Sequence, residues 1–385
     1  MKVLLVCKAL HFTYKGGIQT HVWELSQALI DQGLDIYILT GAKPAWGAKE
    51  RVVEGRHLIE LPTLPGYRMR WFANTIDEIA FNLQVIRWLW KHEQEFDVIH
   101  FHGRSGLAWP MFFPGRLSKC LLTVHGLTAE EWAYNRKNFD RWVHAQVSNL
   151  AEKIAAKRLP VLIAVSQDQA DRINERFERP RLGIKMIPNG IQQSDLIPYP
   201  TEKWIAFVGR IEGIKGVDLL PDILSKMPKD VGLFMIGSGQ EKNALQRRFQ
   251  ELGLGNQVVW TGAIDPVEVL HYLGRSSLLL LPSRYEPQGR VILEAMSVGR
   301  PFVGSNTGGI KEMLRSGSEG RLVDPHSVAD IVSAISSLLQ NPDEAEAMGI
   351  SGRKTVMSHY SWASLGPEVM NVYQELVGHE KMVQL

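Results

Sequence analysis

Residues 278–296, LLLLPSRYEPQGRVILEAM, carry the pattern that decides the fold. The four leucines at 278–281 form a short apolar run typical of a buried parallel strand, and residues 291–298 have the spacing of an amphipathic helix. Gly289 lies at the junction, where the first backbone amides of a helix favour an anion. The stretch therefore predicts a strand–loop–helix unit of an open α/β sheet, with a ligand loop beyond the carboxyl end of the strand.

The same alternation of apolar runs and helical patterns fills the chain in two sets. Alternating strands and helices predict parallel sheets with helices on both faces, and two such sheets predict a ligand cleft between domains. The turn Pro188-Asn189-Gly190 separates the sets, so we place a domain boundary at residue 190. The predicted strands are Val3–Val6, Ile36–Leu39, Val98–Phe101, Leu121–Val124 and Val161–Val165, then Ile205–Val208, Leu233–Ile236, Val258–Trp260, Leu278–Leu281 and Phe302–Val303.

Length, charge and cysteine content narrow the class of protein. A chain of 385 residues predicts two or three domains, and a net charge of +2 gives no sign of a nucleic-acid partner. Cys7 and Cys120 form no disulfide framework, which favours a reducing compartment. The opening apolar run is too short for a signal peptide, and no stretch approaches the roughly 20 apolar residues of a membrane span. We therefore expect a cytoplasmic protein, at most peripheral to the inner membrane face.

Two glycine-containing loops are candidate anion sites. Lys15-Gly16-Gly17 lies between the first predicted strand and a helix that begins near Ile18, where backbone amides can approach a ligand. A tight strand-to-helix turn is the alternative. In Val208–Gly216, Arg210 and Lys215 follow a strand end, and the alternative there is a solvated basic loop. Arginine can bind two phosphate oxygens at once, while lysine adds a mobile point charge.

Residues 278–296 also place two glutamates, one on either side of the strand-to-helix junction. Glu294 lies one turn inside the helix, where a carboxylate can accept two hydroxyls of a ribose. Glu286 lies on the loop and would face whatever is attached to the phosphates. The amides of Gly289, Arg290 and Val291 would then face the phosphates themselves. The alternative, two solvated acids, is disfavoured because Asn306–Gly309 repeats the same strand–glycine–helix pattern on the neighbouring crossover.

Taken in order, these motifs resemble those of glycosyltransferase family four. The resemblance extends from Lys2 to Tyr373 and rests on five motifs, each of moderate specificity and together highly specific. They are Gly16–Val22 with Leu25 and Leu29, Val208-Gly209-Arg210, Lys215-Gly216, the pair Glu286 and Glu294, and Gly308–Glu312.

The resemblance implies a GT-B fold, in which two Rossmann-like domains face each other across a cleft. It implies an acceptor-binding domain at residues 1–190 and a donor-binding domain, for a nucleotide sugar, at residues 191–357. The last segment, residues 358–385, is then a helix that crosses back to the first domain. The implied activity is transfer of a sugar from a UDP- or GDP-sugar to a hydroxyl of a glycan or lipid-linked acceptor, as in polysaccharide assembly.

The resemblance also assigns roles in a reaction that retains the anomeric configuration. Glu286 would orient a hydroxyl of the donor sugar, and His125 matches the family histidine near that sugar. Arg210 and Lys215 would stabilise the leaving diphosphate. The chain has no Asp-x-Asp motif placed to hold a divalent ion, so we expect neither a metal nor another cofactor. A structural histidine is the alternative for His125.

Two positions depart from the family pattern. Gln288 replaces an aromatic residue and Arg290 an aliphatic one, so the donor's identity does not carry over. We expect Arg290 to be a third phosphate-binding cation or to recognise an acidic group.

On the acceptor side, Lys15 and Arg104 are candidates for contact with an anionic acceptor. Residues 68–72 and 136–142 mix basic residues with aromatics, and residues 107–114 are rich in aromatics, which suits a membrane interface or a lipid-linked acceptor. Core packing explains these three segments equally well.

Other functions remain open on the sequence. A GT-B-like sugar-nucleotide epimerase would bind the same diphosphate, and so would a non-catalytic sugar-nucleotide-binding protein. The complete set of charged site residues argues against lost activity. An NAD enzyme is disfavoured because the chain lacks the fingerprint G-x-G-x-x-G.

Overall fold

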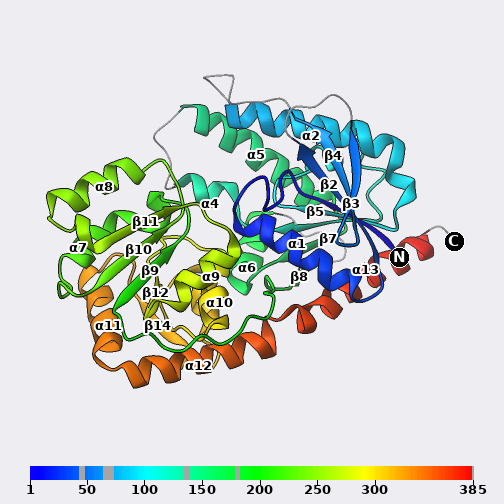
Figure 1. The fold of residues 1–385 in the computed structure, drawn as a ribbon. Helices are drawn as coiled ribbons and strands as arrows, with labels where there is room; N and C mark the ends of the chain where they lie inside the picture. Colours follow the sequence, from blue (N-terminus) through cyan, green and yellow to red (C-terminus); the bar gives the residue numbers. More distant parts are fainter. Residues whose placement is uncertain (43–47, 64–72, 134–138, 178–182, 384–385) are drawn as a thin grey trace. The chain divides into compact units, whose positions relative to one another are not determined.

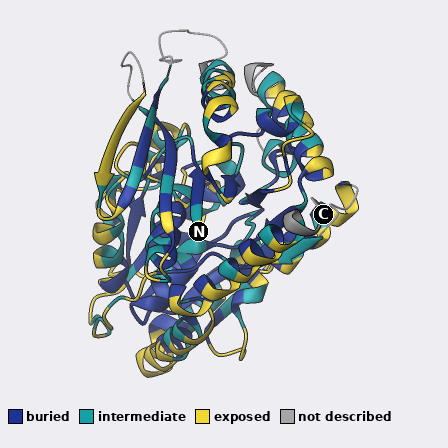
Figure 2. Cartoon of the chain, turned by 90° about the vertical axis from the view of Figure 1, so that its right-hand side faces the viewer, coloured by how far each residue is buried: buried dark blue, intermediate teal, exposed yellow. Residues whose placement is uncertain are grey.

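A computed structural model describes residues 1–42, 48–63, 73–133, 139–177 and 183–383 of the protein (Figure 1). The chain forms two compact units. The first unit combines Met1–Gly190 with Trp362–Leu385, and the second is Ile191–Ser361. Each unit is a sheet with helices on both faces. In Figure 2 the strands are largely buried, whereas the helices carry bands of exposed residues.

The first unit contains an eight-stranded sheet in the order β3-β4-β2-β1-β5-β6-β7-β8. All neighbouring strands are parallel except β3 and β4, which form an antiparallel pair. The strands are β1 (Lys2–Val6), β2 (Asp35–Ala42), β3 (Lys49–Val53), β4 (Arg56–Pro62), β5 (Val98–His102), β6 (Cys120–Val124), β7 (Val161–Ala164) and β8 (Ile184–Met186).

Two apolar cores sandwich this sheet, because successive side chains of a strand point to opposite faces. Leu4 and Val6 of β1 join the core under α2, α3, α5 and α6, while Val3 and Leu5 join the core under α1 and α13. The helices are α1 (Gly17–Ile30), α2 (Ala73–His92), α3 (Ala108–Phe112), α4 (Thr128–Ala133), α5 (Phe139–Arg158), α6 (Gln167–Arg176) and α13 (Trp362–Val383), with the 3-10 turn η2 (Glu93–Glu95).

The second unit contains a six-stranded, wholly parallel sheet in the order β11-β10-β9-β12-β13-β14. Its strands are β9 (Trp204–Val208), β10 (Gly232–Ile236), β11 (Val258–Gly262), β12 (Leu278–Leu281), β13 (Phe302–Ser305) and β14 (Gly320–Val323). Its helices are α7 (Leu220–Leu224), α8 (Lys242–Glu251), α9 (Pro266–Gly274), α10 (Arg290–Ser297), α11 (Val328–Gln340) and α12 (Pro342–His359), with 3-10 turns η3 (Gly213–Lys215), η4 (Val217–Leu219), η5 (Gly255–Gln257) and η6 (Gly308–Met313).

The ten predicted strands are all present, each within a few residues of the expected bounds. Four further strands, β3, β4, β8 and β14, escaped the sequence pattern because they are short or lie at or next to sheet edges. The expectation of purely parallel sheets is wrong for β3 and β4. Glu54 and Gly55 have positive φ values of 49° and 79°, and such a two-residue turn joins antiparallel strands without a crossover helix.

Candidate active site

Three loops of the second unit meet at the carboxyl ends of β9, β12 and β13, which are neighbours in the sheet. The amide of Arg284, on the loop after β12, donates to the carbonyl of Ile214 at 2.9 Å. On the other side, the amide of Gly309 donates to the carbonyl of Glu286 at 3.0 Å. The loop after β12 is therefore held between the other two.

Glycine is required at both contacts. Gly216 has a φ of +68°, and a β-carbon there would lie 2.0 Å from the carbonyl oxygen of Pro282. Gly308 has a φ of +52°, and its β-carbon would lie 2.2 Å from the carbonyl oxygen of Glu286. Any side chain at either position would push the loops apart, because such separations lie far inside van der Waals contact.

Lys215 and Glu286 form an ion pair inside this arrangement. The Nζ atom of Lys215 donates to Oε2 of Glu286 at 2.6 Å, and each side chain is 14% exposed. An ammonium group has three donors and this bond uses one, while a carboxylate accepts several hydrogen bonds. The two residues are 71 positions apart in the sequence, and the structure brings them together, while their roles on phosphate and sugar stay predictions.

Arg290 and Glu294 form a second pair, one turn apart on α10. The Nε atom of Arg290 lies 3.2 Å from Oε1 of Glu294, and both side chains are largely buried. Gly289 precedes this helix in a left-handed conformation, and Val291 is half-buried in its first turn. The structure therefore places Arg290 on the carboxylate expected to hold the ribose, whereas Gln288 is 1% exposed and buried in the protein.

Arg210 is exposed, with Nη1 3.1 Å from Oε2 of Glu212. A different arginine, which sequence reasoning missed, ties the loops together. The guanidinium of Arg284 donates to both carboxylate oxygens of Asp218, at 2.6 and 2.7 Å. Burial alone would raise the pKa of Asp218, but the bonds and charge of Arg284 outweigh it and hold that pKa below its usual value. The signal that could have pointed to Arg284 is its place on the loop within residues 278–296.

In the first unit, the predicted glycine loop precedes α1. Gly16 is the residue before the helix and adopts an extended conformation, Gly17 begins the helix, and Lys15 is exposed. Thus Lys15, Gly16 and Gly17 lie where a strand-to-helix loop was expected, and their contact with a ligand stays a prediction.

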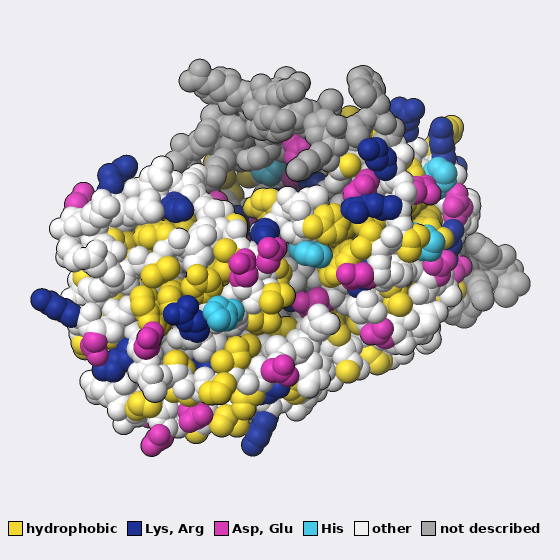
Figure 3. All heavy atoms as spheres, in the orientation of Figure 1, with side chains coloured by type: hydrophobic (Ala, Val, Ile, Leu, Met, Phe, Trp, Pro, Cys, Tyr) yellow, Lys and Arg dark blue, Asp and Glu magenta, His cyan; other side chains and the backbone are white. Residues whose placement is uncertain are grey.

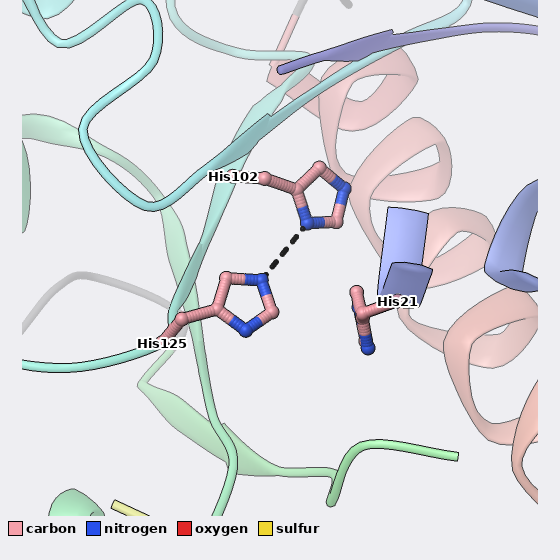
Figure 4. Close-up of side chains that lie close together, drawn as sticks. All are labelled: His21, His102 and His125. Atoms are coloured by element: carbon pink, nitrogen blue, oxygen red, sulfur yellow. Dashed lines mark hydrogen bonds between the residues drawn. The ribbon is translucent and has the colours of Figure 1, made fainter. Parts of the chain in front are cut away.

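His125 follows β6 and is half-buried, beside the buried imidazoles of His21 and His102 (Figure 4). Its Nε2 atom is 3.3 Å from Nδ1 of His102, the last residue of β5. His21, on α1, has its ring centroid 4.6 Å from that of His125 and 5.5 Å from that of His102. Sequence reasoning missed His21 and His102. His102 ends a strand, as a ligand residue of such a sheet does, and His21 lies within the motif Gly16–Val22.

The two histidines of β5 are uncharged at neutral pH. Burial first, and then the nearby imidazole of His125, together lower the pKa of His100 to about 3. The pKa of His102 lies well below its usual value, first because of burial and then because of the neighbouring histidines. Neutral imidazoles are hydrogen-bonding groups and metal ligands rather than anion-binding cations.

The same three imidazoles are the place where a metal could bind. In the described part of the chain, His21, His102 and His125 form the one group of three ligand residues whose donor atoms lie within 4.8 Å of one another. Three neutral imidazoles suit a zinc ion chemically. The facing nitrogens of His102 and His125, however, already share a hydrogen bond. The absence of a metal requirement stays a prediction.

Arg104 is surrounded by carboxylates. Its Nε atom lies 3.3 Å from Glu78, and its Nη1 atom lies 3.8 Å from Glu131. Glu152 is buried beside them and accepts hydrogen bonds from the amide and hydroxyl of Thr128. The carboxylates of Glu78 and Glu131 therefore already neutralise the guanidinium, and its contact with an anionic acceptor stays a prediction.

Two family models together match most of the chain. One, described as Glycosyltransferase Family 4, matches residues 15–194, and the other, described as Glycosyl transferases group 1, matches residues 191–355. The chain belongs to glycosyltransferase family four.

Curated relatives span the whole length of this glycosyltransferase. It is 26% identical to the 2-deoxystreptamine N-acetyl-D-glucosaminyltransferase of Niallia circulans, over 95% of this chain and 100% of that protein. It is 27% identical to the phosphatidyl-myo-inositol mannosyltransferase of Mycobacterium leprae, over 100% of each. The sucrose-phosphate synthase of Thermosynechococcus elongatus has the same fold, with a TM-score of 0.84, 20% identity and coverage of 98% and 99%. The glycosyltransferase thus has the GT-B fold.

The buried carboxyl group of Glu152 makes the stability of this glycosyltransferase depend on pH. Burial raises its pKa from 4.5 to about 7, although the hydrogen bonds from Thr128 act in the opposite direction. The folded state therefore holds a proton that the unfolded chain releases near pH 4.5. The contribution to stability is complete below that pH and is lost as the pH rises to about 7, at up to roughly 1.4 kcal/mol per pH unit.

We expect Glu152→Gln to remove this dependence, because the amide has no proton to lose and can still accept from Thr128. Urea denaturation of both proteins between pH 5 and 8 measures the effect. As the pH rises, the free energy of unfolding of the variant should increase relative to that of the wild type. Glu175→Gln, on the exposed side of α6, is the matched control. Parallel curves for wild type and Glu152→Gln would contradict the assignment.

Proposed function

We propose that this glycosyltransferase moves a sugar from a UDP- or GDP-sugar to a hydroxyl of a glycan or lipid-linked acceptor, with retention and without a metal ion. The observation that carries the proposal is the pair Lys215–Glu286, held between glycine loops at the carboxyl ends of three parallel strands. A diphosphate and a sugar need a cation and a carboxylate side by side, which this pair supplies.

The leaving group determines what the residues of the second unit must do. As the bond between the anomeric carbon and phosphate breaks, negative charge grows on the diphosphate. Lys215, Arg210 and the first amides of α10 are the groups that stabilise this charge without a metal. Glu286 orients a hydroxyl of the donor sugar, and Glu294 accepts the ribose hydroxyls. Arg290, which is paired with Glu294, holds that carboxylate in position as well as adding positive charge.

Retention follows from a same-face reaction. The acceptor oxygen forms its bond to the anomeric carbon on the face that the phosphate leaves, and the acceptor proton passes to a phosphate oxygen. No carboxylate nucleophile is required, in contrast to retaining glycosidases. His125 contributes a hydrogen bond to the donor sugar, in line with the resemblance to the family histidine.

The acceptor side of the proposal includes a contact with anionic lipid. Residues 68–72 and 136–138 lie outside the described residues, and Trp109 is buried in the core, as the packing alternative requires. The helices α2 and α5, which lie side by side (Figure 1), nevertheless expose apolar residues among lysines and arginines. These residues are Ile79, Leu83, Arg87, Trp90 and Lys91 on α2, and Trp142, Val147, Leu150, Lys153 and Lys157 on α5.

Exposed tryptophans flanked by basic residues favour the interface of an anionic membrane. Within the described residues, no helix has the length and apolarity to cross a bilayer. On the face drawn in Figure 3, acidic and basic side chains are interspersed, which does not favour a nucleic-acid partner.

The first test is nucleotide binding in EDTA. Thermal unfolding is recorded with UDP, GDP, ADP or NAD, for wild type and Glu294→Ala. A ligand at about 100 times its dissociation constant adds about 2.7 kcal/mol to the stability. We expect UDP or GDP to stabilise wild type and the variant to lose this response. A response to NAD alone, or loss of binding in EDTA, would contradict the proposal.

The second test concerns turnover. We expect Glu286→Gln to lower kcat by more than ~100-fold with nucleotide affinity little changed, because the carboxylate acts on the sugar and not on the base. Glu251→Gln, at an exposed position on α8, is the control. Near wild-type turnover in Glu286→Gln would refute the role. Product analysis without acceptor separates a transferase from an epimerase, and a binding protein would give no product.

The third test is flotation with liposomes that contain anionic lipid. We expect the protein to float at low salt and to be released by salt, because lysines and arginines contribute about 1 kcal/mol each near such a surface. Replacing Trp90 and Leu83 by serine should abolish flotation, and the same change at exposed Val267 of α9 should not. Failure of the wild type to float at low salt would contradict the proposed membrane contact.

A further inference from the structure

The histidine cluster behind His125 has a function that the reaction scheme leaves open. Strands β5 and β6 are parallel neighbours, with His102 opposite Thr123 in the register. Because side chains alternate between faces, His100 and His102 share one face of β5. His100 bonds to Tyr373 and Thr123 at 2.7 Å each, so both of its ring nitrogens are satisfied. Its ring lies 4.1 Å from that of His102 and supports it from one side.

His102 is different, because one of its nitrogens has a partner and the other does not. Its Nδ1 atom faces Nε2 of His125 at 3.3 Å, and Figure 4 shows the two rings joined at these atoms. Its Nε2 atom is buried and has no hydrogen-bond partner among the described residues. A neutral imidazole carries one proton, which must be on one of these two atoms.

The environment decides between them. A proton on Nε2 of His102 would be a buried N–H without an acceptor, and orphaned buried N–H groups are rarer than unpaired acceptors. A proton on Nδ1 is instead donated to His125. The imidazoles of His21, His100 and His125 around His102 also oppose a second proton on its ring.

We infer that His102 is a positioning residue that fixes the tautomer of His125: His102 donates through Nδ1 to Nε2 of His125, so that His125 carries its proton on Nδ1. Free neutral histidine prefers the proton on Nε2, so the protein imposes the less common form. His125 is half-buried, and it presents Nδ1–H as a hydrogen-bond donor. Its part in the reaction, as far as this rests on the proposed function, is to donate to an oxygen of the donor sugar and not to act as a base.

The test reads the tautomer directly. Protein labelled with ¹⁵N in its 12 histidines is examined by long-range ¹H–¹⁵N correlation NMR, with EDTA present so that no metal ion bridges the rings. The signals of His125 are those lost in His125→Asn. In the wild type we expect Nδ1 of His125 in the protonated range and Nε2 in the unprotonated range. The reverse assignment overturns the inference.

Two variants of His102 separate positioning from packing. The side-chain amide nitrogen of an asparagine lies close to the position of Nδ1 of a histidine, and that of a glutamine lies close to the position of Nε2. We expect His102→Gln to move His125 toward the Nε2–H form and His102→Asn to keep the Nδ1–H form. His100→Gln, an equally buried change that has no bond to His125, should leave the tautomer in place. An unchanged tautomer in His102→Gln overturns the inference.

Kinetics provide the second readout. We expect His102→Gln to lower kcat by ~10-fold or more, with His102→Asn closer to wild type and the dissociation constant of the nucleotide unchanged in both. Equal kcat values in the two variants count against positioning. If wild type transfers no sugar from any donor, the proposed function fails, and the NMR result still decides the tautomer. If His125→Asn retains full turnover, the catalytic role of His125 fails independently.

Discussion

At the carboxyl edge of the second unit's sheet, two backbones lie directly against a third. Gly216 approaches the carbonyl of Pro282 and Gly308 approaches that of Glu286, each at a distance that leaves no room for a β-carbon. These contacts hold the loop after β12 between its neighbours. They place Lys215, on the loop after β9, against Glu286, on the loop after β12. The ion pair is thus a consequence of backbone packing, and the carboxylate reaches the lysine because no side chain separates the loops.

The charges of this edge are balanced before any ligand arrives. Lys215 is paired with Glu286, and Arg290 with Glu294, in surroundings that are largely buried. A buried cation without a partner is costly, so such pairing keeps the cations in place at a tolerable free energy. A sugar diphosphate supplies oxygens for the cations and hydroxyl donors for the carboxylates. In the proposed function, contacts with the ligand therefore replace the ion pairs between protein side chains, and the charges stay balanced.

The first unit contains several buried imidazoles beside an otherwise hydrophobic sheet. Two of these imidazoles are contacted by α13, the last helix of the described residues. Its Tyr373 accepts or donates the hydrogen bond that satisfies His100, and its Trp362 lies 5.2 Å from His21, ring centroid to ring centroid. Neutral, hydrogen-bonded rings are compatible with burial, whereas charged ones are not. The C-terminal segment is therefore part of the structure that supports His125.

The sequence by itself determined ten of the strands, the helices that follow them, the glycine loops and the family, because these depend on local periodicity and on residue types at short spacing. It located Lys215, Glu286, Glu294 and His125 as candidates, although their roles remain predictions. Only the tertiary structure decided which of them touch. The bond between Lys215 and Glu286, the carboxylates around Arg104 and the contact of His102 with His125 all join segments that are distant along the chain. Such contacts follow from strand order and register, which no local pattern specifies.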